Sequence, residues 1–185
     1  MERTERGLTL LELVIVLVVV GIVASMAVPG FQSLIEDTTR RSQMQSMVGL
    51  FNLARIRAVS EATIVTVCPL DGSDQCTGDW HQPVHVFADP DNQRALANNT
   101  TVFRVRKPVQ SGSWRVHVGN RGYFQYRPNG MVRGTLGNLT WCPESGNEKN
   151  AGQLIVNMGG RLRYAQDHSG DGVVQDSRGQ PVKCP

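Results

Sequence analysis

Residues 8–28 read LTLLELVIVLVVVGIVASMAV, a run of 21 residues that is almost wholly apolar. An α-helix needs about 20 such residues to cross ~30 Å of hydrocarbon, so this run predicts a helix that can span a bilayer. Ala24-Ser25-Met26-Ala27 also loosely fits the small-residue cleavage site of a secretory signal. The run by its length alone is therefore either a retained anchor or a removable signal.

Glu12 favours the anchor, because a carboxylate is unusual in the apolar part of a signal peptide. Placing it inside an apolar span costs about 3 kcal/mol on insertion scales, and an ionisable residue there marks a functional position by default. We therefore expect a single-pass anchor in which Glu12 has a role of its own.

The pattern around this residue is Gly7-Leu8-Thr9-Leu10-Leu11-Glu12-Leu13, and the apolar run that follows ends at Pro29-Gly30-Phe31. This pattern resembles the N-terminal segment of type IV pilins and pseudopilins. The resemblance implies that prepilin peptidase cuts between Gly7 and Leu8 and that Leu8 is then N-methylated, although Leu8 stands where Phe is usual. It also implies a place in the bacterial inner membrane with the globular part in the periplasm, and later in the pilus at the cell surface. The partners implied are other major and minor pilins and the inner-membrane assembly platform.

Glu12 and Pro29 are the residues expected to serve subunit assembly. Glu12 lies four residues, or one helical turn, from the new amino terminus at Leu8, so the two charges can pair. In the pilin family this Glu meets the amine of a neighbouring subunit. Pro29 removes one N–H and clashes with the preceding turn, which predicts a kink after which the helix continues.

Composition and charge agree with one domain and an appendage. The 185 residues are 19% charged and 40% hydrophobic, which excludes a disordered tail protein and a multi-span membrane protein. From Glu61 to Asp91 there are six carboxylates and no Lys or Arg, whereas from Arg94 to Arg163 there are eleven Lys or Arg against two Glu. The later half is therefore basic.

Behind the anchor, the apolar spacing indicates a helix and then a sheet. Residues 31–62 contain no Pro, and apolar side chains recur on one side of the expected helix. After Ala62 the period becomes two, with turns between short runs. The expected strands are Ile64–Cys68, Val84–Ala88, Thr101–Arg106, Trp114–Val118, Tyr123–Arg127, Leu139–Cys142, Leu154–Met158 and Arg161–Gln166. Gly159-Gly160 is expected to form a two-residue hairpin turn with positive φ at both positions.

A second, looser resemblance concerns Leu53-Ala54-Arg55 and Ala58, then Val65-Thr66-Val67-Cys68-Pro69, then Cys76 and Trp80. These residues resemble the GspH-like domain of FimT/FimU minor pilins and of the type II secretion pseudopilin H. The fold implied is α+β and type IV pilin-like, a long kinked N-terminal helix packed on antiparallel sheet. The expected division is a leader at 1–7, a transmembrane and filament-core helix at 8–30, an amphipathic helix at 31–62 and a periplasmic β-sheet domain with a C-terminal tail at 63–185.

The four cysteines all follow the apolar run, on the side expected to lie outside the cytoplasm, so disulfides are expected. Three pairings are open, and we favour Cys68 with Cys76 and Cys142 with Cys184. Zinc is the less favoured alternative, because there is no CxxC pair and the four His residues lack ligand-like spacing. Residues 167–172 resemble the first half of a calcium loop, but Arg178 stands where a bidentate Glu should close it, which favours a plain turn. No metal or cofactor is expected.

Strand alternation places basic side chains together on one face of each expected strand. Gly160-Arg161-Leu162-Arg163 also has the Gly-Arg-x-Arg form that resembles FimT-like pilins which capture DNA. If the strands are neighbours, their outer face is a basic field that suits double-stranded DNA, although an ordinary solvated face has the same pattern. The candidate DNA-binding residues are Arg161 and Arg163 as principal contacts, with Arg104, Arg106, Arg115 and, if the tail folds back, Lys183.

The function implied is that of a minor type IV pilin, assembled into or at the tip of the pilus and supporting pilus biogenesis, twitching motility, DNA binding and DNA uptake in natural transformation. The alternative is an H-type pseudopilin in type II protein export. An enzyme is not supported, because the sequence has no nucleophile elbow, metal motif or paired carboxylates among apolar residues, and no catalytic residue is assigned.

Overall fold

The computed structural model describes residues 9–134 and 136–184, and at 26–29 it describes the course of the helix without the side chains. The expected cleavage and methylation positions, Gly7 and Leu8, therefore lie outside the described residues. The first element, α1 (Leu10–Ser60), is one continuous helix. It begins at Thr9, whose side chain accepts a hydrogen bond from the Glu12 backbone N–H at 3.3 Å, as an N-cap residue does. As expected, the helix continues through Pro29.

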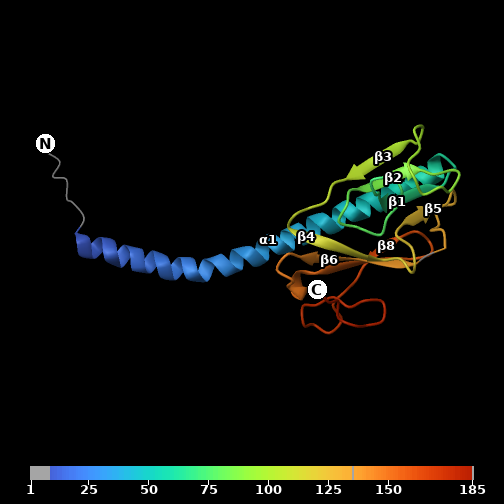
Figure 1. Ribbon diagram of the computed structural model, residues 1–185. Coiled ribbons are helices and arrows are strands. Elements are labelled where there is room, and N and C mark those ends of the chain that lie inside the picture. The colour runs from blue at the N-terminus through green and yellow to red at the C-terminus, as the bar shows by residue number, and fades with distance from the viewer. Residues whose placement is uncertain (1–8, 135, 185) are drawn as a thin grey trace, which may run out of the picture.

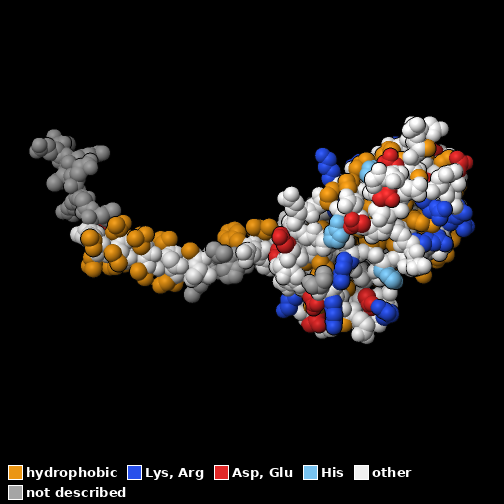
Figure 2. Space-filling view, in the orientation of Figure 1, with side chains coloured by type: hydrophobic (Ala, Val, Ile, Leu, Met, Phe, Trp, Pro, Cys, Tyr) orange, Lys and Arg blue, Asp and Glu red, His pale blue; other side chains and the backbone are white. Residues whose placement is uncertain are grey.

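Figure 1 shows that α1 extends far beyond the domain and bends within the part that projects from it. Every described side chain of residues 10–35, here called the free half, is exposed, and Figure 2 shows hydrophobic side chains over much of it. α1 is the one helix in the described chain that is long and apolar enough to cross a membrane, with a mean hydropathy of 2.8 in its most apolar window and none of that window buried. The remaining residues, 36–60, form the docked half.

The strands form two antiparallel sheets of four, both of which contact α1. The first sheet has the order β3-β2-β1-β5, and its strands are β1 (Val65–Pro69), β2 (Val84–Ala88), β3 (Val102–Arg106) and β5 (Phe124–Tyr126). The second has the order β4-β6-β7-β8, and its strands are β4 (Gly112–His117), β6 (Gly137–Pro143), β7 (Gly152–Val156) and β8 (Leu162–Tyr164). A short 3-10 helix, η1 (Glu148–Asn150), connects β6 to β7.

The core lies where the docked half of α1 meets both sheets. Phe51 of α1 is fully buried, and its ring meets Phe124 edge-on at 5.0 Å and Tyr126 at 6.4 Å between centroids. The helical stripe expected from the sequence forms this contact, since its members are buried or partly buried: Met44, Met47, Val48, Phe51, Ala54 and Ala58. Because the main core cluster starts only at Met44, a fragment from residue 31 onward contains all of it.

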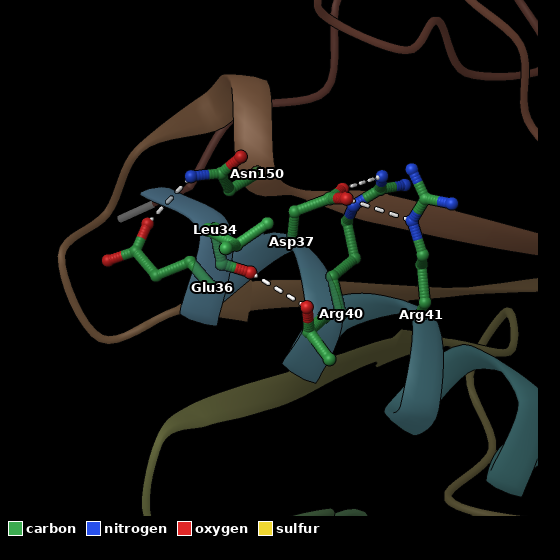
Figure 3. A network of polar contacts seen from close by, with 7 residues as sticks. Leu34, Glu36, Asp37, Arg40, Arg41 and Asn150 are labelled. Carbon is green, nitrogen blue, oxygen red and sulfur yellow. Dashed lines mark hydrogen bonds and ion pairs between the residues drawn. The ribbon is translucent and has the colours of Figure 1, made fainter. Parts of the chain in front are cut away.

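Polar contacts fix the point where α1 enters the domain (Figure 3). Glu36 accepts a hydrogen bond from the Asn150 side chain of η1 at 2.8 Å, which joins residues 114 positions apart. The next residue, Asp37, pairs with Arg40 and Arg41 about one turn further along the helix, with Arg41 at 2.8 Å. The bond from Asn150 ties the helix to η1, whereas the Asp37 pairs lie within α1 and stabilise its turns.

The expected strands are all present, with bounds that differ by a few residues. The hairpin expected at Gly159-Gly160 is present between β7 and β8, but its predicted geometry is wrong. Val156 pairs with Leu162, and Asn157 donates to the carbonyl of Arg161, so the loop has three residues and only Gly160 has a positive φ, +75°. That is the arrangement of a turn followed by one left-handed residue.

Both favoured disulfides are present in the structure. Cys68 is bonded to Cys76 beside β1, and Cys142 of β6 is bonded to Cys184 near the C-terminus. The second bond holds the tail, residues 166–184, against the second sheet.

Candidate functional site

The outer face of the second sheet, which points away from α1, carries the candidate site. In β4 and β6, Trp114, Leu139 and Trp141 belong to the core, so the alternating residues face outward. Register places Arg115 opposite Thr140 and His117 opposite Asn138. On the far side of the sheet, Arg163 of β8 lies opposite Ile155 of β7. The outer face therefore has cationic side chains at both edges, with neutral polar residues and Ile155 between them.

Arg161 and Arg163 lie at the β8 edge of this face. Both are exposed, whereas Leu162 between them is partly buried against the core, so the two Arg residues lie on the side of the chain that faces away from the core. Among the described residues, no ion pair joins either Arg to an acidic side chain. The pair therefore presents two uncompensated positive charges to solvent.

The turn that carries Arg161 is held by contacts from the first sheet. A Cβ atom on Gly160 would lie 2.3 Å from the Gly130 carbonyl oxygen and 2.8 Å from the Tyr126 ring. Tyr126 donates a buried hydrogen bond to the Gly160 carbonyl at 3.1 Å, and burial raises the pKa of its phenol. Gly130 in turn accepts a hydrogen bond from Arg55 of α1 at 3.0 Å. Only glycine fits at position 160, and the turn is fixed to both β5 and α1.

The structure contradicts the inclusion of Arg104 and Arg106 in the same basic field. Both lie on β3, an edge strand of the first sheet, whereas β4 and β8 are opposite edges of the second. Arg104 and Arg106 line a hollow beside α1, and Arg106 is only 9% exposed. Its guanidinium donates to Gln43 of α1 and lies 5.8 Å from the Trp114 ring centroid, and desolvation by burial lowers its pKa. Arg106 therefore connects the helix to both sheets and is not part of an exposed basic surface.

Arg115 and Lys183 meet at the β4 edge, 68 residues apart in sequence, because the tail folds back over the outer face. Arg115 donates a hydrogen bond to the Lys183 carbonyl, and the Cys142–Cys184 disulfide is adjacent. The tail, red in Figure 1, is held in shape by its own backbone hydrogen bonds, and its residue Val182 is buried. Sheet and tail together line an open groove of about 560 Å³, here called the tail groove.

The residues resembling half a calcium loop form a plain turn. The Asp167 carboxylate accepts backbone N–H bonds from Ser169, Gly170 and Gly172 at 2.7–3.0 Å, and the bond from Gly172 contributes most to lowering its pKa. Its oxygens are thus engaged by the turn itself. The described part of the chain contains no group of three or more His, Cys, Asp or Glu placed to hold a metal ion.

Sequence reasoning missed the residues that support the site, chiefly Tyr126, Gly130 and Arg55. Asn129-Gly130 is a dipeptide typical of turns, but nothing in the local sequence indicates that this turn packs against Gly160. The tail groove could not be predicted from the sequence either, because it forms only when the tail folds back over β4 and β6.

Comparisons with known proteins agree with this architecture. The family model for the type II transport protein GspH matches residues 43–160, and the model for the prokaryotic N-terminal methylation motif matches residues 3–28. Two crystal structures of the type IV minor pilin FimU from Pseudomonas aeruginosa are similar in fold, each at 16% identity and a TM-score of 0.52. One match covers 68% of this chain and 92% of that chain, the other 80% and 99%. No curated protein matches the sequence. The chain, with its α+β fold of one long helix on antiparallel sheets, therefore belongs to the GspH family of pilin-like proteins and carries their N-terminal methylation motif.

Proposed function

We propose that this protein is a minor type IV pilin whose globular domain also binds double-stranded DNA. In this proposal residues 1–7 are removed by prepilin peptidase, Leu8 is methylated, and residues 8–30 anchor the subunit in the inner membrane. The domain from residue 63 onward lies in the periplasm until the assembly platform moves the subunit into the pilus. Its work there supports pilus biogenesis, twitching motility and DNA uptake.

The assembly role is supported by the free half of α1. Its apolar side chains are exposed, and a surface of this size is stable only in lipid or against other subunits. Glu12 is exposed within it, one turn from the expected new amino terminus, where a partner's amine would neutralise it. Association with other pilins is what membership of the family implies.

DNA binding is supported chiefly by Arg161 and Arg163, which a rigid turn presents side by side. Two exposed guanidinium groups without acidic partners attract phosphates by Coulomb attraction and counterion release, with little dependence on base sequence. The fixed turn lowers the entropic cost of holding them in place. Arg161 and Arg163 are therefore proposed as the principal phosphate contacts.

The second candidate is a pseudopilin of type II secretion, favoured by the printed description of the matching family as a type II transport protein. Such a subunit would use the same free half of α1 in a different filament. Deletion of the protein separates the two: loss of twitching and DNA uptake supports the pilus, and loss of protein export with normal twitching supports the secretion system.

A salt-dependent titration tests DNA binding. The fragment from residue 31 onward is titrated with a double-stranded oligonucleotide between 50 and 200 mM salt, beside the double variant Arg161→Ala, Arg163→Ala. Losing two phosphate contacts should reduce the slope of log K against log salt by about 1.8. The matched control is Arg104→Ala, which removes one exposed charge from the other sheet and should leave the slope unchanged. An unchanged slope in the double variant, with its fold intact, would contradict the proposal.

A further inference from the structure

The tail groove has the form of a small-molecule site on the outer face of the second sheet. Its volume of about 560 Å³ lies within the range of about 300–1,000 Å³ typical of such sites. One wall is β4 and β6, and the other is the tail, which the Cys142–Cys184 disulfide holds in place. The groove is therefore a preformed concavity.

The charge within the groove is unbalanced. Arg115 and Lys183 both line it with exposed side chains, and His117 lies two residues beyond Arg115 on the same face of β4. The one carboxylate in the lining, Asp176, accepts hydrogen bonds from the backbone of Arg178 and Gln180 and pairs with the Arg178 guanidinium at 3.3 Å. Asp176 is thus occupied by its own turn, which leaves the cations of β4 and the tail for an anion.

The rest of the lining favours a ligand with hydroxyl groups over a bare ion. Asn138 is half-buried in the groove wall, and among the described residues its side chain has no hydrogen-bond partner. Thr140 beside it accepts a hydrogen bond from Gln153 at 2.9 Å and keeps its hydroxyl proton for a further acceptor. Pro181 adds an apolar surface against which the C–H face of a ring can pack.

We propose that the tail groove binds an acidic sugar, with its acid group on Arg115 and Lys183 and its hydroxyl groups on Asn138 and Thr140. The shared chemistry is a hydroxylated ring with a carboxylate or a phosphate. This site is separate from Arg161 and Arg163, which lie on and beside β8, at the other edge of the sheet. The proposal therefore does not rest on DNA binding.

Isothermal titration of the full chain in detergent micelles tests it with four probes: D-glucuronate, D-glucose 6-phosphate, D-glucose and inorganic phosphate. At least one of the two acidic sugars should bind at least tenfold more tightly than both D-glucose and inorganic phosphate, and the stronger of them identifies the acid group. The proposal is overturned if neither acidic sugar binds, if D-glucose binds equally well, or if inorganic phosphate does.

Matched variants locate the binding. Arg115→Gln should weaken the binding of the acidic sugar at least tenfold, whereas Arg161→Gln, the same change at the other edge, should leave it unchanged. Lys183→Gln is a second variant that should leave the fold intact, because Arg115 contacts only the backbone carbonyl of Lys183. Lys183→Gln should weaken the binding of the acidic sugar at least threefold. Equal effects of Arg115→Gln and Arg161→Gln would place the sugar elsewhere and overturn the assignment. A DNA titration of the same samples reports separately on the proposed function.

Discussion

Replacing Gly160 with Ala tests whether the turn before β8 is held as described. Gly160 has a φ of +75°, and an added Cβ would lie 2.3 Å from the Gly130 carbonyl oxygen. The left-handed backbone alone costs an L-residue about 1–2 kcal/mol. The contact with backbone cannot be relieved by a side-chain rotation, and overpacking of this kind adds about 1–3 kcal/mol.

Taken together, these two effects should lower the free energy of unfolding by about 3 kcal/mol. For a domain of about 150–250 residues, each kcal/mol shifts Tm by about 2–4 °C, so the expected loss is about 6–12 °C. Gly170 supplies a matched control, since its φ is +79° but no atom lies within 4 Å of the added Cβ. Gly170→Ala should therefore cost only the backbone part, about 1–2 kcal/mol.

The measurement is thermal and urea unfolding of the fragment from residue 31 onward, for both variants and the parent. Gly160→Ala should also weaken DNA binding when folded, because Arg161 follows the displaced residue directly. Equal losses of stability in the two variants would refute the reasoning, since the close approach to Gly130 and Tyr126 would then carry no cost.

Three further outcomes are expected. Asp89 is 3% exposed and accepts hydrogen bonds from Thr66, Gln93, Arg94 and Gln125. Asp89→Ala should therefore lower the free energy of unfolding in urea by about 3–5 kcal/mol. Asp91 is exposed, and Asp91→Ala should change the same free energy by no more than about 0.5 kcal/mol. Burial raises the pKa of Tyr126, so its contribution to the free energy of unfolding is complete below pH ~10. Above that pH the phenol ionises in the unfolded chain while it is still protonated in the folded protein. The free energy of unfolding should then fall by up to about 1.4 kcal/mol per pH unit relative to Tyr126→Phe, and parallel curves for the two proteins from pH 9 to 11 would count against this cause. Glu12→Gln should leave the protein in the membrane fraction but keep it out of sheared filaments, and normal incorporation would show that the charge is dispensable.

Local pattern predicted the elements well, because each element is encoded within its own residues. The docked half of α1 shows its stripe at helical spacing, with Met47, Phe51, Ala54 and Ala58 all buried. The strand at Val84–Ala88 has the expected bounds, since apolar alternation ends at Pro83 on one side and at Asp89-Pro90 on the other. Elements whose periodicity and bounding turn residues lie within about ten residues can be predicted without knowledge of the fold.

The division of the strands into two sheets could not be predicted in this way. β5 pairs with β1 across about 59 residues, and β4 pairs with β6, so Arg104 and Arg115 belong to different sheets although only eleven residues separate them. Alternation shows which side chains share a face of a strand, but it gives neither the neighbouring strand nor which face is outward: Arg104 and Arg106 lie opposite the core residues Val86 and Val84. The assignment of Arg104 and Arg106 to one basic field with Arg161 was wrong for this reason. Arg161 and Arg163 lie together at the β8 edge, and their binding of DNA stays a prediction.

The two disulfides have a mechanical consequence for a subunit that is pulled. One closes residues 68–76 and the other joins 142 to 184, so no covalent cross-link connects α1 to either sheet. Tension applied along the helix is carried by the buried apolar side chains of its docked half and by two hydrogen bonds, one from Arg106 to Gln43 and one from Asn150 to Glu36. Under rising force the helix should slide out before the sheets come apart, and the force that extracts the helix should not change when the disulfides are reduced.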